Sequence, residues 1–287
     1  MQEFEFLSTK SLKEALKFMD ENGKKTKVIA GGTDLMIDLR QYKFDNLEYI
    51  LDISSLSQLQ YINKTDNKIR VGGLTRHKDV TESKLIQNKA SLLAEGCSQV
   101  GSPQIRNRGT LAGNIATASP CADSVSPLVA LDAVVVLKSR DDKREIPLSK
   151  LIEGPYNTGI KDNELITEIY FAPSEDGVKS KFIKLARRNA AAKSRLNIAC
   201  LAEQDNSGKI NYLSLVPGSV TPCPQRFSEV EEMLLDEIPD EKLLKKAGDM
   251  VAKEMIKQTG YRWSTDYKKP AVTSLTSRVL HSVLEVK

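Results

Sequence analysis

Apolar and polar residues alternate along this chain in short blocks, a pattern that predicts short strands and helices joined by irregular connections. A strand is expected at 4–7, and the helix after it is well marked, because residues 11–14 (SLKE) form a capping box and Gly23 supplies a C-terminal stop. The apolar stripe of this helix consists of Leu12, Ala15, Leu16 and Met19. We interpret this part of the chain as scaffold.

Apolar and β-branched runs predict the other strands, and apolar residues at helical spacing predict the other helices. The expected strands are 27–30, 49–53, 68–71, 133–138, 144–147 at a sheet edge, 163–171, 197–203 and 210–216. The expected helices are 85–100, 126–132, 228–235, 240–257 and 271–285. Turns are expected at 66–67 and at 204–209, where a hairpin closes. This mixture predicts an α+β fold.

Residues 99–123 (QVGSPQIRNRGTLAGNIATASPCAD) interrupt the pattern with small and polar residues around three glycines. The glycines are Gly101, Gly109 and Gly113, and we expect Pro103 and Pro120 to prevent a regular helix here. Glycine permits positive φ and lets a ligand approach the main chain closely, so successive N–H groups can form a concave anion site. The stretch therefore predicts a loop that binds through its backbone.

A second glycine loop, 28–35 (VIAGGTDL), lies upstream and reads as a buried strand that enters a tight turn at Gly31-Gly32-Thr33. Two such loops indicate a ligand with two phosphates, such as a dinucleotide, although a single Gly-Gly turn is more often structural. The chain has no GxxxxGK[ST] loop, and neither Gly31-Gly32 nor Gly72-Gly73 extends into GxGxxG. These absences disfavour a Walker ATP site and a Rossmann fold.

Composition limits the function classes. The chain has 287 residues, enough for two or three structural units, with 40% hydrophobic and 28% charged residues, as in ordinary globular proteins. The net charge of +4 does not imply a nucleic-acid partner. No apolar run approaches the roughly 20 residues that span a membrane, and the first residues lack a basic segment before an apolar core. We expect a cytoplasmic protein with no membrane partner.

Cysteine and histidine residues give no metal pattern. Cys97, Cys121, Cys200 and Cys223 are far apart in sequence and form no CxxC pair. We therefore expect reduced, mostly buried thiols and neither a metal nor an iron–sulfur site. No acid–base pair or activated nucleophile is recognisable, and His77 is interpreted as structural. The chemistry is therefore expected to belong to a bound cofactor.

Three motifs in order resemble the signature of the FAD-binding subunit of molybdenum hydroxylases, the family of the flavin subunits or domains of xanthine, carbon monoxide and nicotinate dehydrogenases. They are Ala30-Gly31-Gly32-Thr33-Asp34-Leu35, Gln104-Ile105-Arg106-Asn107-x-Gly109-Thr110-x-x-Gly113-Asn114, and Pro120-x-x-Asp123. The resemblance covers nearly the whole chain. It implies an FAD-binding domain of the vanillyl-alcohol-oxidase (PCMH) type at 1–175, with subdomains 1–60 and 61–175. It also implies a C-terminal domain of the CO dehydrogenase flavoprotein type, a small sheet covered by helices, at 176–287.

The same resemblance implies a set of FAD contacts. The pyrophosphate and neighbouring ribitol would be wrapped by Val28, Ile29, Ala30, Gly31, Gly32, Thr33, Asp34 and Leu35. The opposing amides and a hydroxyl would come from Thr110, Leu111, Ala112, Gly113 and Asn114. A polar group of the cofactor such as a ribose hydroxyl would be held by Asp123, and the flavin or adenine would lie near Val100, Ile166 and Lys184. Val100 and Ile166 also fit ordinary core packing. Many relatives have Gly-Gly before the asparagine, whereas this chain has Ala112-Gly113-Asn114.

The implied function is an electron relay. A molybdopterin subunit would oxidise a substrate, an iron–sulfur subunit would pass single electrons, and FAD on this chain would collect two for an acceptor. NAD⁺ is the expected acceptor, and NADP⁺, ferredoxin and a quinone stay open. Two alternatives are a free-standing FAD oxidase, for which we find no substrate base, and an assembly subunit that has lost its flavin, which the intact glycine loops disfavour.

Residues 179–195 (KSKFIKLARRNAAAKSR) contain seven basic residues and no acidic residue. A solvated surface is the simpler interpretation. The alternative is a positive rim that attracts an anionic partner, either a pyridine nucleotide phosphate or an acidic electron carrier.

Overall fold

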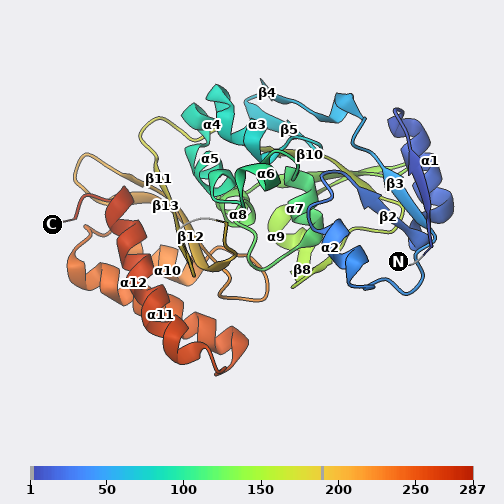
Figure 1. Cartoon of the computed structure of the whole chain (residues 1–287). Helices are drawn as coiled ribbons and strands as arrows, with labels where there is room; N and C mark the ends of the chain where they lie inside the picture. Colours follow the sequence, from blue (N-terminus) through green and yellow to red (C-terminus); the bar gives the residue numbers. More distant parts are fainter. Residues whose placement is uncertain (1–2, 189–190, 287) are drawn as a thin grey trace.

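The computed structural model describes residues 3–188 and 191–286 (Figure 1). The N-terminal unit is a parallel sheet with strand order β1-β3-β2. Its elements are β1 Glu5–Ser8, α1 Leu12–Asn22, the 3₁₀ turn Gly23–Lys25, β2 Thr26–Ile29, α2 Leu35–Arg40 and β3 Tyr49–Asp52. The predicted first helix is confirmed, with Ser11 as its cap and Ala15, Leu16 and Met19 buried. Strand β2 therefore delivers the chain directly into the first glycine loop.

A five-stranded antiparallel sheet, in the order β4-β5-β10-β6-β7, forms the centre of the molecule. Its strands are β4 Ile62–Thr65, β5 Lys68–Gly72, β6 Val134–Lys138, β7 Lys143–Pro147 and β10 Leu165–Phe171. Strand β7 lies at an edge, as predicted, and Asp66 and Asn67 form the β4–β5 turn with positive φ. The small hairpin of β8 Ile152–Gly154 and β9 Asn157–Thr158 stands beside this sheet.

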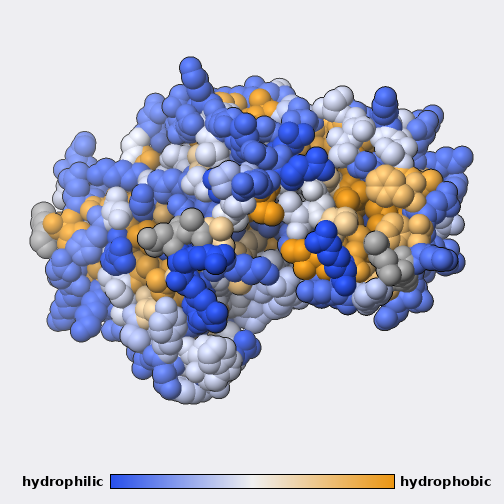
Figure 2. Space-filling model, viewed as in Figure 1, coloured by the Kyte–Doolittle hydropathy of each residue, from blue (hydrophilic) through white to orange (hydrophobic). Residues whose placement is uncertain are grey.

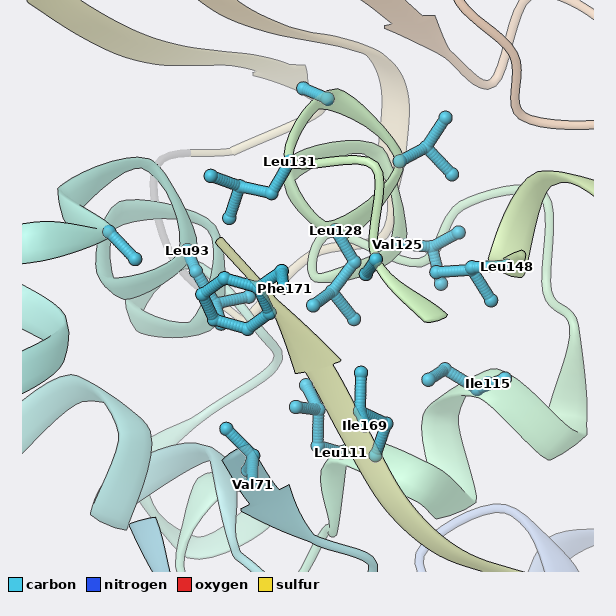
Figure 3. Close-up of a cluster of buried hydrophobic side chains, with 14 of the residues drawn as sticks. Val71, Leu93, Leu111, Ile115, Val125, Leu128, Leu131, Leu148, Ile169 and Phe171 are labelled. Carbon is cyan, nitrogen blue, oxygen red and sulfur yellow. The ribbon is translucent and has the colours of Figure 1, made fainter. Parts of the chain in front are cut away.

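Helices pack over the five-stranded sheet and complete the main core (Figure 3). They are α3 His77–Glu82, α4 Lys84–Lys89, α5 Ser91–Ser98, α7 Leu111–Thr117, α8 Val125–Ala130 and α9 Leu148–Leu151. The short helix α6 Pro103–Arg106 has no buried residue, and a 3₁₀ turn lies at Ser57–Leu59. Side chains from α7, α8 and α9 converge on Ile169 and Phe171 of β10. This burial fixes both ends of the central glycine-rich stretch.

The C-terminal unit is an antiparallel sheet, β11-β12-β13, covered by three helices. Its elements are β11 Lys179–Ala186, β12 Ser194–Gln204, β13 Ile210–Gly218, α10 Ser228–Leu234, α11 Glu241–Thr259 and α12 Thr265–Val283. Along β12, Ala199 and Leu201 pack into the main core, whereas Ile198 and Cys200 pack into the core under α10–α12. Both faces of this sheet are therefore buried, and the sheet joins the two units.

Three expectations about secondary structure were wrong, and one strand was missed. The helix expected at 85–100 is two helices, α4 and α5, because Ala90 leaves the helical region with φ −157° and ψ 46°. Strand β11 was not predicted, because its lysines hid the alternation of inward-facing residues. Pro103 does not prevent a helix, since it is the first residue of α6, where its missing N–H costs nothing, whereas Pro120 lies between α7 and α8. Helix α12 begins at Thr265 and contains Pro270.

Candidate functional site

The two glycine loops predicted from the sequence touch each other. A Cβ placed on Gly31 would lie 2.2 Å from the Arg108 carbonyl oxygen and 2.9 Å from the Gly109 Cα. A Cβ placed on Gly109 would in turn lie 3.4 Å from the Thr33 Oγ1. Only glycine therefore allows the backbones of the two loops to come this close. Segments far apart in the sequence form one continuous backbone surface.

The first loop turns through Gly32, which has φ +73°. This left-handed conformation ends β2 and starts α2 within a few residues. Val28 and Ala30 pack against the core that contains α1, whereas Ile29 and Leu35 pack against a small core around Leu39. The apolar side chains of 28–35 thus anchor the loop. The backbone of 31–33, the Thr33 hydroxyl and the Asp34 carboxyl are the groups available to a ligand.

The second loop ends at the beginning of α7. Thr110 caps this helix, and its Oγ1 accepts a hydrogen bond from the Gly113 N–H at 3.1 Å. The Leu111 N–H donates to the Thr75 carbonyl at 2.9 Å. Leu111 and Ala112 are buried in the main core, so their side chains hold the helix in place. The methyl group of Ala112 points into this core, where it does not occupy the space in front of the loop.

Asp123 lies in a buried polar cluster that joins the two units. Its Oδ2 accepts from the Lys184 Nζ at 2.6 Å, and its Oδ1 accepts from the Ser194 hydroxyl and, at 3.3 Å, from the Asn197 amide. The Ser126 hydroxyl donates to the Asn197 Oδ1 at 2.8 Å. Burial raises the pKa of the Asp123 carboxyl, and the Lys184 ammonium opposes this rise. Each carboxylate oxygen has a donor, which is the usual condition for a buried charge.

Lys184 is held from both sides. Its side chain is 8% exposed, and its Nζ also donates to the Gln99 carbonyl at 2.8 Å. Gln99 precedes Val100, whose carbonyl accepts from the Arg106 guanidinium at 3.1 Å. Lys184 of β11 therefore lies directly beside the start of the central glycine-rich stretch.

Asn114 and Ile166, the remaining residues predicted to contact FAD, lie away from the contact between the two glycine loops. The Asn114 Oδ1 accepts from the Ser124 hydroxyl at 2.7 Å, which couples α7 to the segment containing Asp123. Ile166 of β10 pairs with Leu137 of β6 and packs partly against the main core. Its carbonyl faces Gly73, where a Cβ would lie 2.4 Å from the Ile166 oxygen. The structure thus links Asn114 to Asp123, and it places Ile166 on β10, which contacts α7.

Three polar residues of the cluster, Ser126, Ser194 and Asn197, were not predicted from the sequence. Asn197 is 0% exposed and sits in the apolar strand β12. An asparagine within a buried apolar run was the available signal, because a buried amide needs partners. Gly218 makes room for it, since a Cβ there would lie 2.1 Å from the Asn197 Oδ1.

His77, the first residue of α3, lies behind the second loop. It is 2% exposed, and a Cβ on Gly109 would lie 3.3 Å from its Cδ2. Its Nδ1 is buried and has no hydrogen-bond partner among the residues that the structure describes. Burial, with a smaller effect of Arg106, lowers the pKa of His77 to about 4. His77 is therefore neutral at pH 7 and supports the loop by packing.

We expect His77 to make the protein sensitive to acid. The pKa of His77 is about 4 in the folded chain and about 6.5 in the unfolded chain. The contribution of neutral His77 to the free energy of unfolding is therefore complete above pH 6.5 and is lost as the pH falls to 4. The loss is about 3 kcal/mol in the free energy of unfolding. Between pH 7 and pH 4, urea denaturation should show that the free energy of unfolding of His77→Phe falls by about 3 kcal/mol less than that of the parent chain. An unchanged slope would contradict the assignment.

The basic segment 179–195 divides into parts with different environments. Lys179, Lys181 and Lys184 belong to β11, whereas Asn189 and Ala190 lie outside the described residues. Partial burial raises the pKa of the Asp34 carboxyl, and the positive charge of Lys193 opposes this rise. The charge at the end of the segment therefore acts on the first glycine loop.

The two joined loops provide backbone groups and the hydroxyls of Thr33 and Thr110, and the charge of Lys193 acts on the first loop. Such a donor set fits a pyrophosphate-bearing cofactor. A family model described as "FAD binding domain in molybdopterin dehydrogenase" matches residues 2–173. The chain belongs to this family. A second model, "CO dehydrogenase flavoprotein C-terminal domain", matches residues 181–283.

Known relatives agree with this family. The glyceraldehyde dehydrogenase medium chain of Sulfolobus acidocaldarius is 31% identical, with 98% of each chain covered. The nicotinate dehydrogenase FAD-subunit of Eubacterium barkeri is 29% identical, covering 99% of this chain and 97% of the relative. Carbon monoxide dehydrogenase from Hydrogenophaga pseudoflava has a structure with a TM-score of 0.91 at 25% identity, with 98% and 97% covered. The resemblance, the α+β fold and FAD as cofactor are therefore confirmed, and the chain is an FAD-dependent oxidoreductase subunit of the molybdenum hydroxylase family.

Metal ligands, reactive thiols and membrane-spanning helices would indicate other functions for the described part of the chain. Its residues contain no group of three or more His, Cys, Asp or Glu side chains that could hold a metal ion. Cys97 and Cys200 are buried, with the pKa of each thiol raised by burial, whereas Cys121 and Cys223 are half-buried. Among residues 3–188 and 191–286, no helix is long and apolar enough to cross a membrane.

Proposed function

We propose that this chain transfers electrons through FAD within a molybdenum hydroxylase complex, taking them from an iron–sulfur subunit and passing them to a separate acceptor. The observation that carries the proposal is the contact between Gly31 and the Arg108–Gly109 backbone, which joins both motif loops into one surface. The two units would divide at 175/176, with subdomains at 1–60 and 61–175. A molybdopterin subunit of the same complex would bind the substrate.

Each part of the site has a distinct role in this proposal. The backbone of 28–35, with the Thr33 hydroxyl, binds one phosphate. Residues 110–114 bind the other through the Thr110 hydroxyl, since the N–H groups of Leu111, Gly113 and Asn114 donate within the chain. Both loops have fixed ends, since their apolar side chains are buried in separate cores. Little conformational entropy is then lost when the cofactor binds.

The buried Lys184–Asp123 pair positions a cation beside the cofactor. Because the Gln99 carbonyl and the Asp123 carboxylate hold the ammonium from two sides, its charge is fixed in place. Bound FAD supplies the redox chemistry, since it can take electrons singly and release two. Val100 and Ile166 provide apolar surface near the ring system.

The acceptor in this proposal is NAD⁺ or another carrier. Two cations support an anionic acceptor, because charge of one sign near a site steers oppositely charged partners. They are Lys193, whose charge acts on Asp34 of the first loop, and Arg195, which follows Ser194, the donor to Asp123.

A spectroscopic experiment tests the proposed function. We expect the purified chain to carry one FAD, identified after its release, and we expect Gly32→Val and Asn114→Ala to lose or weaken it. Electrons from a reduced iron–sulfur partner should bleach the flavin absorbance, whereas substrate alone should not. A folded chain that cannot be loaded with FAD would refute the proposal. Turnover of a small substrate by the isolated chain would favour a free-standing oxidase instead.

A further inference from the structure

The turn between α11 and α12 carries exposed aromatic side chains that the flavin site does not use. Trp263, the single tryptophan of the chain, is 90% exposed, and Tyr261 and Tyr267 are 70% and 50% exposed. Such large rings are usually buried, because each removes much apolar area from water. Three of them on one short segment are typical of a surface that a partner covers.

Cations surround these rings. The Arg195 guanidinium lies 5.7 Å from the centre of the Tyr267 ring. Arg262 on the turn and Lys269 in the first part of α12 are exposed. Within the described ranges, none of these three cations forms an ion pair with a carboxylate. Asp266, the single acidic residue of 260–270, accepts a hydrogen bond from the Tyr261 hydroxyl. The surface formed by 193–195 and 261–269, called here the aromatic–basic surface, is therefore net positive.

This surface is tied to the candidate flavin site by direct contacts. Ser194 donates to Asp123 on the inside, while its neighbour Arg195 stacks on Tyr267 outside. The Lys268 Nζ donates to the Ser219 carbonyl at 2.7 Å, and the Ser219 hydroxyl donates to the Pro120 carbonyl at 2.9 Å. Burial, together with Arg262 and Arg195, lowers the pKa of Lys268, as expected for positive potential at this place.

The shape of the surface favours a protein over a small molecule. The tip where α11 and α12 meet protrudes, and side chains of intermediate hydropathy cover it (Figures 1 and 2). Small ligands bind in concave sites. Cavities of about 580 Å³ and 500 Å³ occur away from this turn, the first between Lys184 and Arg278 and the second between α10 and α11. A protruding aromatic turn with a rim of cations instead resembles the centre of a protein interface, where Trp, Tyr and Arg are enriched.

We propose that the aromatic–basic surface docks a small acidic electron-carrier protein, which is the acceptor for the flavin. The inference rests on the proposed function and selects one acceptor class from those left open. Two electrons leave the reduced flavin one at a time, one to each of two carrier molecules, and the flavin protons go to solvent. A one-electron carrier needs proximity to the flavin, whereas a hydride acceptor needs direct contact with it.

Binding provides the first test, with an acidic two-iron ferredoxin as the probe. The FAD-loaded chain is immobilised, and association of oxidised ferredoxin is followed at low and high salt. We expect saturable binding that weakens at least tenfold at high salt, since charged rims act mainly through steering. Trp263→Ser and Arg262→Glu should each weaken binding at least tenfold without loss of FAD. Lys253→Glu, the same charge change at an exposed residue of α11 outside this surface, should have little effect.

Electron transfer provides the second test. The photoreduced flavoprotein is mixed with ferredoxin or with NAD⁺, and reoxidation is followed by flavin absorbance. We expect ferredoxin to reoxidise the flavin faster, with the rate lowered at least tenfold in Trp263→Ser. The inference is overturned if NAD⁺ is faster, if ferredoxin does not bind, or if a basic protein of similar size binds equally well. Each of these results leaves the flavin content, and so the proposed function, intact.

Discussion

Replacing Gly31 with alanine should weaken FAD binding about a hundredfold. The added Cβ would lie 2.2 Å from the Arg108 carbonyl oxygen and 2.7 Å from the Arg108 carbonyl carbon, both of them backbone atoms. Backbone cannot move aside as a flexible side chain can, so the two loops must separate. Overpacking of this kind costs about 3 kcal/mol, and the same amount taken from cofactor binding corresponds to about a hundredfold weaker affinity. Flavin absorbance after gel filtration, followed by titration with FAD, measures the effect.

Gly154→Ala is the matched control. The nearest atom to a Cβ on Gly154 is the Asn157 Cβ at 3.9 Å, an ordinary contact, and its φ is not positive. We expect this variant to bind FAD like the parent chain. If Gly31→Ala also keeps its FAD affinity while folded, the two loops do not form the cofactor site.

Lys184→Met should strongly destabilise the protein. The Lys184 and Asp123 side chains are 8% and 5% exposed, so the substitution leaves a buried carboxylate without its cation. Breaking a buried ion pair by removing one partner costs about 3–5 kcal/mol. Urea denaturation at pH 7 should show a loss of this size in the free energy of unfolding. Since Ser194 and Asn197 still donate to Asp123, the lower end of the range is expected.

Two further variants separate the buried charge from the loss of a lysine. Asp123→Asn combined with Lys184→Met removes both charges, and we expect it to recover part of the stability lost in the single variant. Lys181→Met removes a lysine from the same strand, where its side chain is 42% exposed and its distance to Glu95 is 3.5 Å. That change should cost less than about 1 kcal/mol. Equal losses for Lys181→Met and Lys184→Met would contradict this account.

Prediction from the sequence succeeded where the signal was local. The capping box and apolar stripe predicted α1, and the Asp66-Asn67 pair predicted the β4–β5 turn. The polar run 204–209 predicted the β12–β13 connection. It failed where neighbours outweighed local preference. Lysines on β11 suggested a solvated segment, yet pairing with β12 and burial of Phe182 make this segment a strand.

The sequence by itself determined the two glycine loops, their order and the kind of ligand they suit, because glycine marks backbone conformations that other residues do not adopt. Only the tertiary structure decided that Gly31 packs on Arg108–Gly109, that Lys184 pairs with Asp123 and that Asn197 completes the cluster. These contacts join residues far apart in the chain, and no local pattern specifies such pairs. The position of Arg195, next to Ser194 of the cluster, was decided in the same way, by the packing of the C-terminal sheet on α5 and α8.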